Sequence, residues 1–300
     1  MSENDFIGIL QICKGLSLTD CYWVTHPDDQ KTFAEVNFFD NRFSQVLSQI
    51  AFTGYGSFPA SKFRPSPEFT TNGMLPKAWR RKEGKVLLYK GGTSGLANTG
   101  KEPYSEFYAA QVAEAMGIPH VTYGLSKWKG QLCSTCELFT SKDVSFVPAS
   151  TLINTSKISK IIDWYDDHGW KNDLADMLVL DAIIRNTDRH LGNFGFLVDN
   201  HTNQLLRPAP IFDNGLSLYC YVMDNDLSNL SEQEKTLAPA LYANFDEVAL
   251  HVIGQKQKQE LRHLLNFRLK KHGRYNLSDE RVKMLENSIQ EKARYLLESA

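Results

Sequence analysis

The chain has 300 residues, of which 42% are hydrophobic, and its 33 basic and 35 acidic residues leave a net charge of −2. Such a chain can bury one large core or two modest ones, and its charge gives no overall positive field that would favour nucleic acid or an anionic membrane. The five cysteines are few, scattered and odd in number, which indicates reduced thiols in a cytoplasmic protein rather than a disulfide framework.

The first 60 residues carry the weakest signals. The N-terminus, MSENDFIGILQIC, starts acidic and its apolar run is broken, so we expect no signal peptide, and no segment reaches the length of a membrane span. Residues 16–24 alternate as a β-strand does, whereas residues 43–50 have the apolar spacing of an amphipathic helix. We assign the aromatic side chains of this region to the core and expect no chemistry from them.

A polar turn, punctuated by Gly and Pro, follows at residues 66–79 (SPEFTTNGMLPKAW). It precedes an apolar strand, predicted at residues 85–90, that ends on Lys90. The next helix should begin near Pro103, which suits a first helical turn, and end before Gly117. This helix offers Glu106 as a carboxylate partner for the Lys90 ammonium, and its alanines would let it pack closely on a sheet.

Residues 95–101 (GLANTGK) match the start of a Walker A loop, G-x-x-x-x-G-K. The match fails at Glu102, which stands where a Ser or Thr hydroxyl should bind magnesium and places a negative charge where phosphate should lie. We therefore interpret residues 91–100 as a connection. The following strand, predicted at residues 131–139, contains Cys133 and Cys136, which should point to opposite faces and so share no metal.

The strongest chemical signal follows an apolar helix predicted at residues 174–184, with Asp173 as its cap. Asp188 and Asn193 form the pattern D-x-x-x-x-N, and a β-hairpin predicted at residues 194–206 leads back to Asp213-Asn214-Gly215. A hydroxyl that attacks the γ-phosphoryl group of ATP needs a carboxylate to accept its proton, and magnesium needs hard oxygen ligands. The arrangement predicts Asp188 as the base and Asn193 and Asp213 as the metal ligands.

Residues near this pattern have more ordinary interpretations. Gly215 should provide backbone angles that other residues avoid, so that the metal loop can turn sharply. Arg185, Arg189 and His190 flank the predicted base and either neutralise phosphate or hold the loop, with a structural role expected for His190. Beyond residue 227 the apolar spacing is helical to the end, and the basic residues near 270–274 are interpreted as a solvated face.

The segments NTDRHLGN (186–193) and PIFDNG (210–215) resemble the HipA-like kinases and, more distantly, the phosphatidylinositol kinases. The resemblance implies the same three roles for Asp188, Asn193 and Asp213. It also matches residues 73–77 to a Gly-x-x-Pro-Lys loop over the ATP phosphates. At Asn214 the chain departs from the Asp-Phe-Gly of a typical kinase, so a switch based on that Phe is not expected.

Further expectations rest on this resemblance. The predicted nucleotide-binding residues are Lys90, Glu106, Thr71, Asn72, Gly73, Glu137 and Phe139, with the backbone of residues 137–139 bonded to adenine. Thr70 or Thr71 is a candidate for autophosphorylation.

We therefore predict a two-lobed α+β, protein-kinase-like fold with a small β-rich N-lobe (residues 1–140) and a larger helical C-lobe (residues 141–300). The expected function is transfer of the γ-phosphoryl of ATP, with Mg²⁺, to a Ser or Thr of a protein substrate. The alternatives are a lipid or small-molecule kinase of the same fold and a nucleotide-binding pseudokinase. An antitoxin-like regulatory partner is possible by resemblance, whereas direct contact with nucleic acid or a membrane is not expected.

Overall fold

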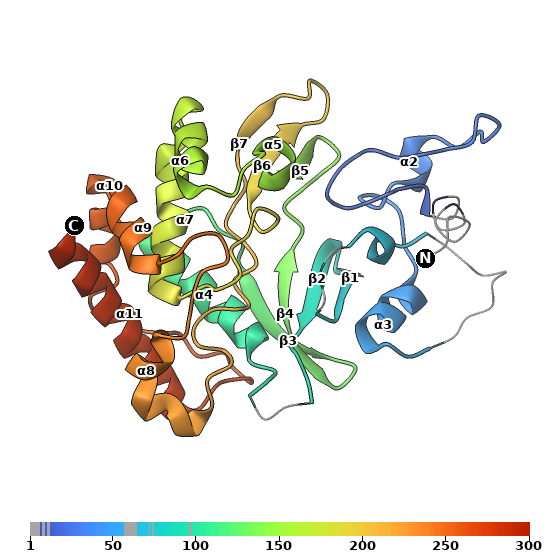
Figure 1. Ribbon diagram of the computed structural model, residues 1–300. Helices are drawn as coiled ribbons and strands as arrows, with labels where there is room; N and C mark the ends of the chain where they lie inside the picture. Colours follow the sequence, from blue (N-terminus) through green and yellow to red (C-terminus); the bar gives the residue numbers. More distant parts are fainter. Residues whose placement is uncertain are drawn as a thin grey trace.

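The computed structural model describes Ile7, Leu10 and residues 13–56, 65–71, 73, 75–95 and 98–300. Within these residues it contains two antiparallel sheets and a set of helices, which confirms the predicted α+β class. The part before residue 140 holds α2 (Phe33–Val36), α3 (Gln45–Thr53), η2 (Pro67–Thr70), β1 (Lys77–Lys82), β2 (Lys85–Gly91), α4 (Glu102–Met116), β3 (Tyr123–Trp128) and β4 (Gln131–Glu137). In Figure 1 the first sheet lies between α3 and the helices of the C-terminal part.

The four-stranded sheet has the order β1-β2-β4-β3. The strands predicted at residues 85–90 and 131–139 are confirmed as β2 and β4, but β1 and β3 were not anticipated. β1 begins inside the segment predicted as a turn. It was not predicted because its charged sequence, KAWRRK, hides the alternation of a strand. Cys133 and Cys136 pack in different apolar clusters on opposite faces of β4, as their spacing predicted.

Helix α3 covers the edge strand β1 of this sheet. The helix predicted at residues 43–50 is present but runs from Gln45 to Thr53. The Ser44 side chain caps its first turn by accepting the N–H of Leu47, and Gly54 ends it in the left-handed conformation, at φ 72°. Phe52, which is buried, fixes the helix against the outer face of the sheet.

The strand predicted at residues 16–24 is wrong. Ser17 forms a local turn instead, in which its hydroxyl accepts the backbone N–H groups of Thr19 and Asp20. Such side-chain bonds compete with the pairing of a strand. Leu16 and Leu18 are nevertheless buried, because the turn packs on the same apolar cluster as β1 and β2.

Helix α4 connects the sheet to the rest of the molecule. It packs against β3 and β4 on one side and against α7 and α10 on the other. Its predicted small residues, Ala109, Ala110 and Ala113, are all buried. The helix ends where expected, because Gly117 adopts the left-handed conformation with φ 77°. Since α4 shares the large core with the C-terminal helices, the division of the chain at residue 140 stays a prediction.

The part after residue 140 is built around α7. It contains β5 (Val144–Pro148), α5 (Ala149–Leu152), α6 (Ile158–Asp167), α7 (Lys171–Ile184), β6 (Gly195–Asp199), β7 (Leu205–Pro208), η3 (Asp224–Asn229), α8 (Leu230–Glu234), α9 (Phe245–Val252), α10 (Gln255–Arg262) and α11 (Asp279–Ser299). Every residue of α7 from Leu174 onwards is buried, so it is the central helix of the large core. Trp170, not Asp173, occupies its N-cap, and Asp173 lies in the first turn instead.

The predicted hairpin is confirmed as β6 and β7, and β5, which was not anticipated, pairs with β6 on the other side. The Asp199 carboxylate holds the turn by accepting the N–H groups of His201 and Thr202. This hairpin carries the chain from the end of α7 out to the surface and back, as Figure 1 shows. It therefore returns the segment after β7 to the vicinity of the α7 C-terminus.

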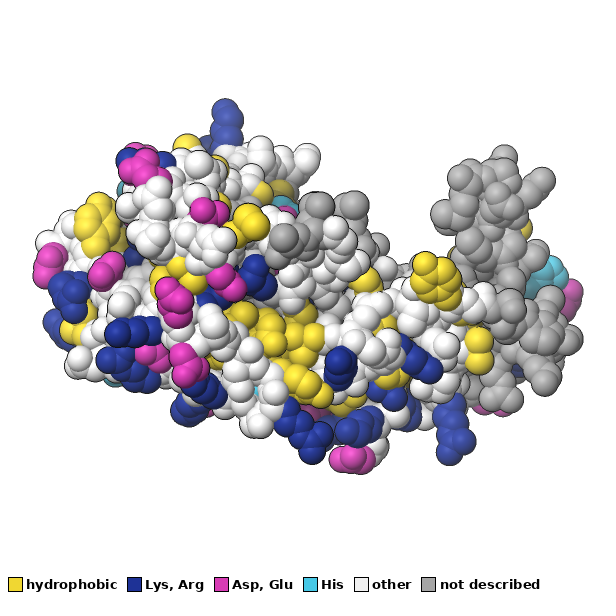
Figure 2. All heavy atoms as spheres, turned by 90° about the horizontal axis from the view of Figure 1, so that it is seen from below, with side chains coloured by type: hydrophobic (Ala, Val, Ile, Leu, Met, Phe, Trp, Pro, Cys, Tyr) yellow, Lys and Arg dark blue, Asp and Glu magenta, His cyan; other side chains and the backbone are white. Residues whose placement is uncertain are grey.

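The C-terminal region is helical, as predicted, but residues 235–244 and 263–278 connect its helices without being helical themselves. The apolar stripe of α11 packs into the large core. Among the residues that the structure describes, none of the helices combines the length and the hydropathy of a membrane-spanning segment. Figure 2 shows one face of the molecule, on which basic and acidic side chains are interspersed around an apolar patch.

Candidate active site

Lys90 lies at the end of β2 with its ammonium between two carboxylates. Its Nζ is 2.9 Å from Oε1 of Glu106 on α4, and it also contacts Oδ1 of Asp213. Only 8% of Lys90 and 1% of Glu106 are exposed. The ion pair expected between Lys90 and Glu106 is therefore present, whereas the contact with Asp213 was not anticipated from the sequence.

The Glu106 carboxylate joins three segments of the chain. While one oxygen accepts from Lys90, the other accepts the backbone N–H of Asn214 at 2.8 Å. Gly215 lies so close that a β-carbon there would be 3.4 Å from the Glu106 carboxylate and 3.6 Å from the Lys90 ammonium. Strand β2, helix α4 and the segment after β7 thus converge on one buried carboxylate.

The charges of this cluster stabilise one another. Burial alone would lower the pKa of Lys90, but the carboxylates of Glu106 and Asp213 raise it above its ordinary value. Burial would likewise raise the pKa of Asp213, but the Lys90 ammonium holds it below the usual range. The Lys90 ammonium therefore favours the ionised form of Asp213, which is the form that a divalent cation requires.

The predicted base lies in the short segment that follows α7. Asp188 is half-buried, and its backbone N–H donates to Oδ1 of Asn186 at 3.1 Å. The Asn193 amide nitrogen donates to the backbone oxygen of Asp188 at 2.9 Å and to its carboxylate at 3.4 Å. Because these bonds orient the Asn193 nitrogen toward Asp188, its amide oxygen is the atom turned to other partners.

Arg189 holds the two predicted metal-ligand segments together. Its side chain is fully buried and forms a two-point ion pair with Asp181 of α7, at 2.9 and 3.0 Å. One nitrogen of the same guanidinium donates to the backbone oxygen of Asn193 at 2.8 Å and to that of Phe212 at 2.7 Å. Asn193 and the residue before Asp213 are thus adjacent in space, although 20 positions separate Asn193 from Asp213 in the sequence.

Asn214 also bonds to this arginine. Its side-chain oxygen accepts from Arg189 at 2.6 Å and from Asn186 at 3.3 Å. A Phe at this position, as in a typical Asp-Phe-Gly segment, could make neither bond. The Asn that replaces the usual Phe therefore has a structural role, because the Asn214 side chain connects the predicted metal loop to the predicted catalytic loop by hydrogen bonds.

The sharp turn of the metal loop occurs at a different residue from the one predicted. Asp213 itself has the left-handed backbone, at φ 56°, whereas Gly215 has no positive φ. The expectation that Gly215 supplies unusual backbone angles is wrong. A β-carbon at Gly215 would meet Glu106 and Lys90 at ordinary contact distances, 3.4 Å and 3.6 Å, so neither the backbone angles nor the space requires a glycine there. The Asp213 N–H donates to the hydroxyl of Tyr123 at 3.3 Å, which supports the strained conformation.

The residues flanking the base have structural partners. Arg185 forms a two-point ion pair with Asp246, at 2.6 and 3.0 Å. A ring nitrogen of His190 accepts the N–H of Gly192 at 3.0 Å, in agreement with the structural role expected for this histidine. Arg185 and Arg189 are thus both bonded to other parts of the chain. These bonds favour a structural role for the two arginines over contact with a nucleotide.

The predicted phosphate loop lies at the start of β1. Of its predicted residues, Thr71 and Gly73 line a cavity of about 560 Å³, whereas Asn72 lies outside the described residues. The Thr71 hydroxyl donates to the carbonyl of Pro67 at 2.7 Å and accepts from the Trp79 indole at 3.0 Å. Thr70 donates to the carbonyls of Leu16 and Pro67, each at 3.1 Å. Phosphorylation of either threonine, which stays a prediction, would break these bonds.

The segment predicted to bind adenine begins at Glu137, the last residue of β4. The N–H of Leu138 already donates to the carbonyl of Val86 at 3.0 Å, so this N–H is not available to a base, and Glu137 lies opposite Leu87 in the ladder of β2 and β4. The Glu137 side chain points outward to Lys85, with 2.6 Å between the charged atoms. Phe139 packs with Phe212, with ring centroids 5.6 Å apart, and so connects this segment to the metal loop.

The competing Walker A interpretation has no support at Glu102. Its carboxylate is buried and accepts from the backbone N–H of Thr93 and the hydroxyl of Tyr221, each at 3.1 Å. A buried carboxylate at this helix start would repel a phosphate. Residues 96 and 97 of the motif lie outside the described residues.

Sequence reasoning missed three contributors to this arrangement. Asp181 sits in an apolar helix pattern, Tyr123 sits in a strand that was not predicted, and Lys77 was noted only as the end of a loop motif. A charged residue inside an apolar helix is a signal that could have identified Asp181, because a buried charge requires a partner. Nothing in the local sequence pointed to Tyr123.

The side chains at this site fit the magnesium nucleotide that the sequence predicts. Asp213 and Asn193 offer a carboxylate and an amide oxygen, which are hard ligands suited to Mg²⁺ rather than to softer metals. Lys90, bound by Glu106, provides a fixed cation for phosphate oxygens. The residues therefore have the chemistry to hold a magnesium nucleotide.

No protein-family model matches the chain. The serine/threonine-protein kinase CtkA of Helicobacter pylori (strain J99 / ATCC 700824) is 28% identical over 149 residues, which covers 43% of this chain and 46% of that protein. The match thus spans less than half the length of the curated relative.

Two solved structures match the chain. The crystal structure of the H. pylori proinflammatory kinase CtkA matches with a TM-score of 0.61 and 19% identity, over 76% of this chain and 91% of that one. The toxin–antitoxin complex of Shewanella oneidensis MR-1 HipA and HipB with operator DNA matches with a TM-score of 0.49 and 10% identity, over 98% and 79% of the chains. The match to CtkA confirms the predicted kinase-like fold.

Proposed function

We propose that this relative of the HipA-like kinases, which shares the fold of CtkA, is an ATP-dependent phosphotransferase that acts on a protein Ser or Thr. The observation that carries the proposal is the convergence of Asp188, Asn193 and Asp213 through the shared bonds of Arg189. The buried Lys90–Glu106 pair supports it independently. A nucleotide-binding module without activity would need no such complete set.

The positions of the residues support the roles that we propose for them. Lys90 would bind the α- and β-phosphates, and Asp213 and Asn193 would hold Mg²⁺, which supplies charge neutralisation at the phosphates. Asp188 would orient the acceptor hydroxyl and take its proton. Thr71 and Gly73 would cover the phosphates from the loop before β1, and the backbone near Glu137 and Phe139 would contact adenine.

The partners of the chain stay predictions. The activity and substrates of CtkA belong to a protein of which the chain matches less than half. We propose a protein as the acceptor, with a lipid or a small molecule as the alternative. An antitoxin-like partner rests on the sequence resemblance alone.

The proposal is tested by offering different acceptors to the purified chain. With γ-labelled ATP and Mg²⁺, we expect phosphate on Ser or Thr of a generic protein such as dephosphorylated casein, located by mass spectrometry of its peptides. Phosphatidylinositol vesicles are the matched alternative acceptor. Transfer to the vesicles only would favour the lipid kinase, and ATP binding without any transfer would favour the pseudokinase. Intact mass of the chain itself shows whether it gains phosphate, and the masses of its peptides show whether Thr70 or Thr71 carries it.

Asp213→Asn should weaken the binding of Mg-ATP by at least about 10-fold. Replacement of a residue that only supports a metal ligand typically costs about this much in metal affinity, and loss of a ligand should cost no less. The amide removes the charge that attracts Mg²⁺ and also one of the two carboxylates beside Lys90. Calorimetric titration with ATP, at several Mg²⁺ concentrations, measures this change.

A matched control for this variant is Asp163→Asn on the exposed face of α6, which removes the same charge from a surface ion pair with Lys160. It should bind Mg-ATP as the unmodified chain does. If Asp213→Asn bound Mg-ATP equally well and with the same Mg²⁺ dependence, Asp213 would not be a metal ligand.

A further inference from the structure

Residues 16–22 contact both sheets of the molecule. Leu16 and Leu18 are 1% and 2% exposed and pack in the apolar cluster that also contains side chains of β1 and β2. On the other side, the carbonyl of Thr19 accepts the backbone N–H of Phe146 on β5 at 2.7 Å. In Figure 1 the chain near the N-terminus, in blue, approaches β5. We call residues 16–22 the N-terminal brace.

The shape of the N-terminal brace is fixed by its own side chains. The Ser17 hydroxyl accepts the N–H groups of Thr19 and Asp20, at 3.1 and 3.0 Å, and donates to the Asp20 carboxylate at 2.9 Å. The same carboxylate accepts the N–H of Tyr22 at 2.9 Å. Local bonds of this kind restrict the backbone of a non-helical segment. The brace therefore spans the two sheets with a defined shape and not as a slack linker.

The brace also bonds to the connection between β4 and β5, through which the chain passes from the first sheet to the second. The Thr140 hydroxyl, in a residue that is 8% exposed, donates to the carbonyl of Leu18. The Cys21 thiol donates to the carbonyl of Lys142 at 3.2 Å. Leu138 packs on the apolar cluster of the brace. The connection is thus attached to the brace along most of its length.

Two neighbouring segments hold the same connection. The Lys142 ammonium lies 2.9 Å from the Asp40 carboxylate. From the turn between β6 and β7, the Asn200 amide nitrogen donates to the Lys142 carbonyl at 2.9 Å and to the Cys21 sulfur at 3.1 Å. Because an exposed ion pair contributes little, the hydrogen bonds and the buried leucines of the brace carry the attachment.

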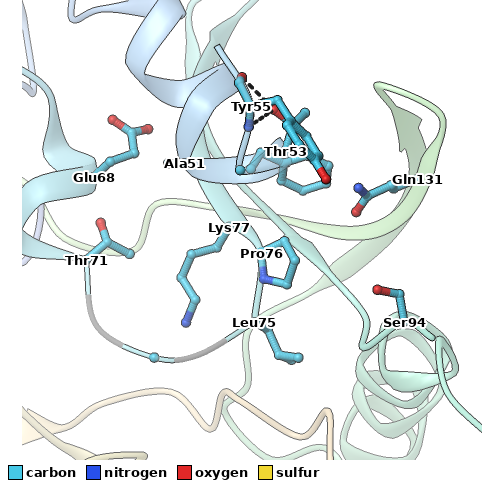
Figure 3. A pocket seen from close by; sticks show the side chains of 13 residues that line it. Ala51, Thr53, Tyr55, Glu68, Thr71, Leu75, Pro76, Lys77, Ser94 and Gln131 are labelled. Carbon is cyan, nitrogen blue, oxygen red and sulfur yellow. Dashed lines mark hydrogen bonds between the residues drawn. The ribbon is translucent and has the colours of Figure 1, made fainter. Parts of the chain in front are cut away.

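The brace lies beside the predicted nucleotide site at two places. Thr140 directly follows Phe139, the end of the segment predicted to bind adenine. The Thr70 hydroxyl donates to the carbonyl of Leu16 at 3.1 Å, and the next residue, Thr71, borders the cavity of the predicted phosphate loop, as Figure 3 shows. The brace therefore contacts the chain next to both predicted parts of the nucleotide site.

We propose that residues 16–22 brace the connection between the two sheets, and that Thr140 is a positioning residue for adenine because it joins this connection to the brace. The second part rests on the proposed function. A backbone that is already held in place costs less free energy to order when adenine binds. Without the Thr140 hydroxyl, the Leu18 carbonyl loses its donor and the connection opens more often.

The experiment uses Thr140→Val, which keeps the shape of the side chain and removes the hydroxyl. In hydrogen exchange followed by mass spectrometry, without nucleotide, peptides that cover residues 138–148 should exchange about 2- to 10-fold faster, the effect of one hydrogen bond. These peptides include the Phe146 N–H that donates to the brace. Peptides from α7 and α11 should exchange at the unmodified rate.

Nucleotide binding gives the second readout. Calorimetry with Mg²⁺ should show that Thr140→Val binds ATP, ADP and AMP more weakly by the same factor, about 2- to 10-fold, because the three nucleotides share adenine. The rate of phosphoryl transfer at saturating ATP should not change, since Thr140 acts on the adenine side of the site. The KM for ATP should therefore rise while kcat stays constant.

Thr140→Ser keeps the hydroxyl and should restore both the exchange rates and the affinities. The matched control is Thr236→Val, which removes an exposed hydroxyl that donates to the Gln233 carbonyl at 2.7 Å and should change neither readout. Thr140→Ala, which adds no methyl group beside Leu18, replaces Thr140→Val if circular dichroism shows that the valine variant does not fold.

Unchanged exchange of residues 138–148 in Thr140→Val would overturn the brace. Faster exchange that extends equally to α7 and α11 would also overturn it, because the hydroxyl would then support only the general stability of the chain. Faster local exchange with unchanged nucleotide affinities would overturn the positioning role. If the unmodified chain bound no nucleotide with Mg²⁺, the proposed function would fail instead, while the exchange rates would still decide whether residues 16–22 act as a brace.

Discussion

Replacement of Asp188 by Asn is expected to lower the rate of phosphoryl transfer by about 10²- to 10⁴-fold, the range typical of the loss of a general base. Asparagine has nearly the same shape but cannot accept the proton of the attacking hydroxyl. The bond from Asn193 to the Asp188 backbone oxygen, 2.9 Å long, does not depend on the carboxylate. The loop should therefore keep its shape, and nucleotide binding should change little.

This prediction is checked by single-turnover transfer assays and by calorimetric titration of the same samples with Mg-ATP. Asp166→Asn is the matched control, because it removes an exposed carboxylate that pairs with Lys171 on the surface. It should retain full activity. Transfer at the unmodified rate by Asp188→Asn would show that Asp188 is not the base, and lost nucleotide binding would indicate a damaged loop.

Arg189→Met should lower the free energy of unfolding by about 3–5 kcal/mol, the usual cost of removing one partner of a buried ion pair. Asp181 would be left in the core without its partner, since both residues are fully buried. The carbonyls of Asn193 and Phe212 and the Asn214 side chain would lose a donor as well. Phosphoryl transfer should therefore fall too, because the two loops lose their common anchor.

Urea unfolding followed by circular dichroism measures the loss of stability. As a control, Arg268→Met removes an exposed arginine from its ion pair with Glu286, whose carboxylate keeps its bond to the Leu269 N–H, and it should cost no more than about 1 kcal/mol. Replacing both charges, as Asp181→Leu with Arg189→Met, should recover part of the stability, since no unpaired charge remains. A single Arg189→Met variant as stable as the Arg268 control would contradict this account.

Much of the fold could be predicted because local spacing encodes it. The apolar run of α7, the Pro and Gly that bound α4, and the polar turn between β6 and β7 are all features of neighbouring residues. Two wrong predictions, at β1 and at residues 16–24, have local causes as well. The charged side chains of β1 hide its alternation, and the Ser17 turn replaces a strand whose apolar spacing was real.

The candidate site divides in a similar way. The sequence by itself determined which residue types are present, and the spacing of Asp188, Asn193 and Asp213 around a hairpin predicted their roles. It also determined that Lys90 ends a strand ahead of a helix bearing Glu106. These features can be read along the chain because each depends on residues close to one another in the sequence.

Only the tertiary structure decided how the segments are held together. It showed that Arg189 bonds both loops, that Asn214 replaces a phenylalanine with a hydrogen-bond acceptor, and that Lys77 faces Gly73 beside Lys90. Each of these relations depends on strand register or on burial among distant segments. No local pattern specifies them, because a buried charge takes whichever partner the packing brings within reach.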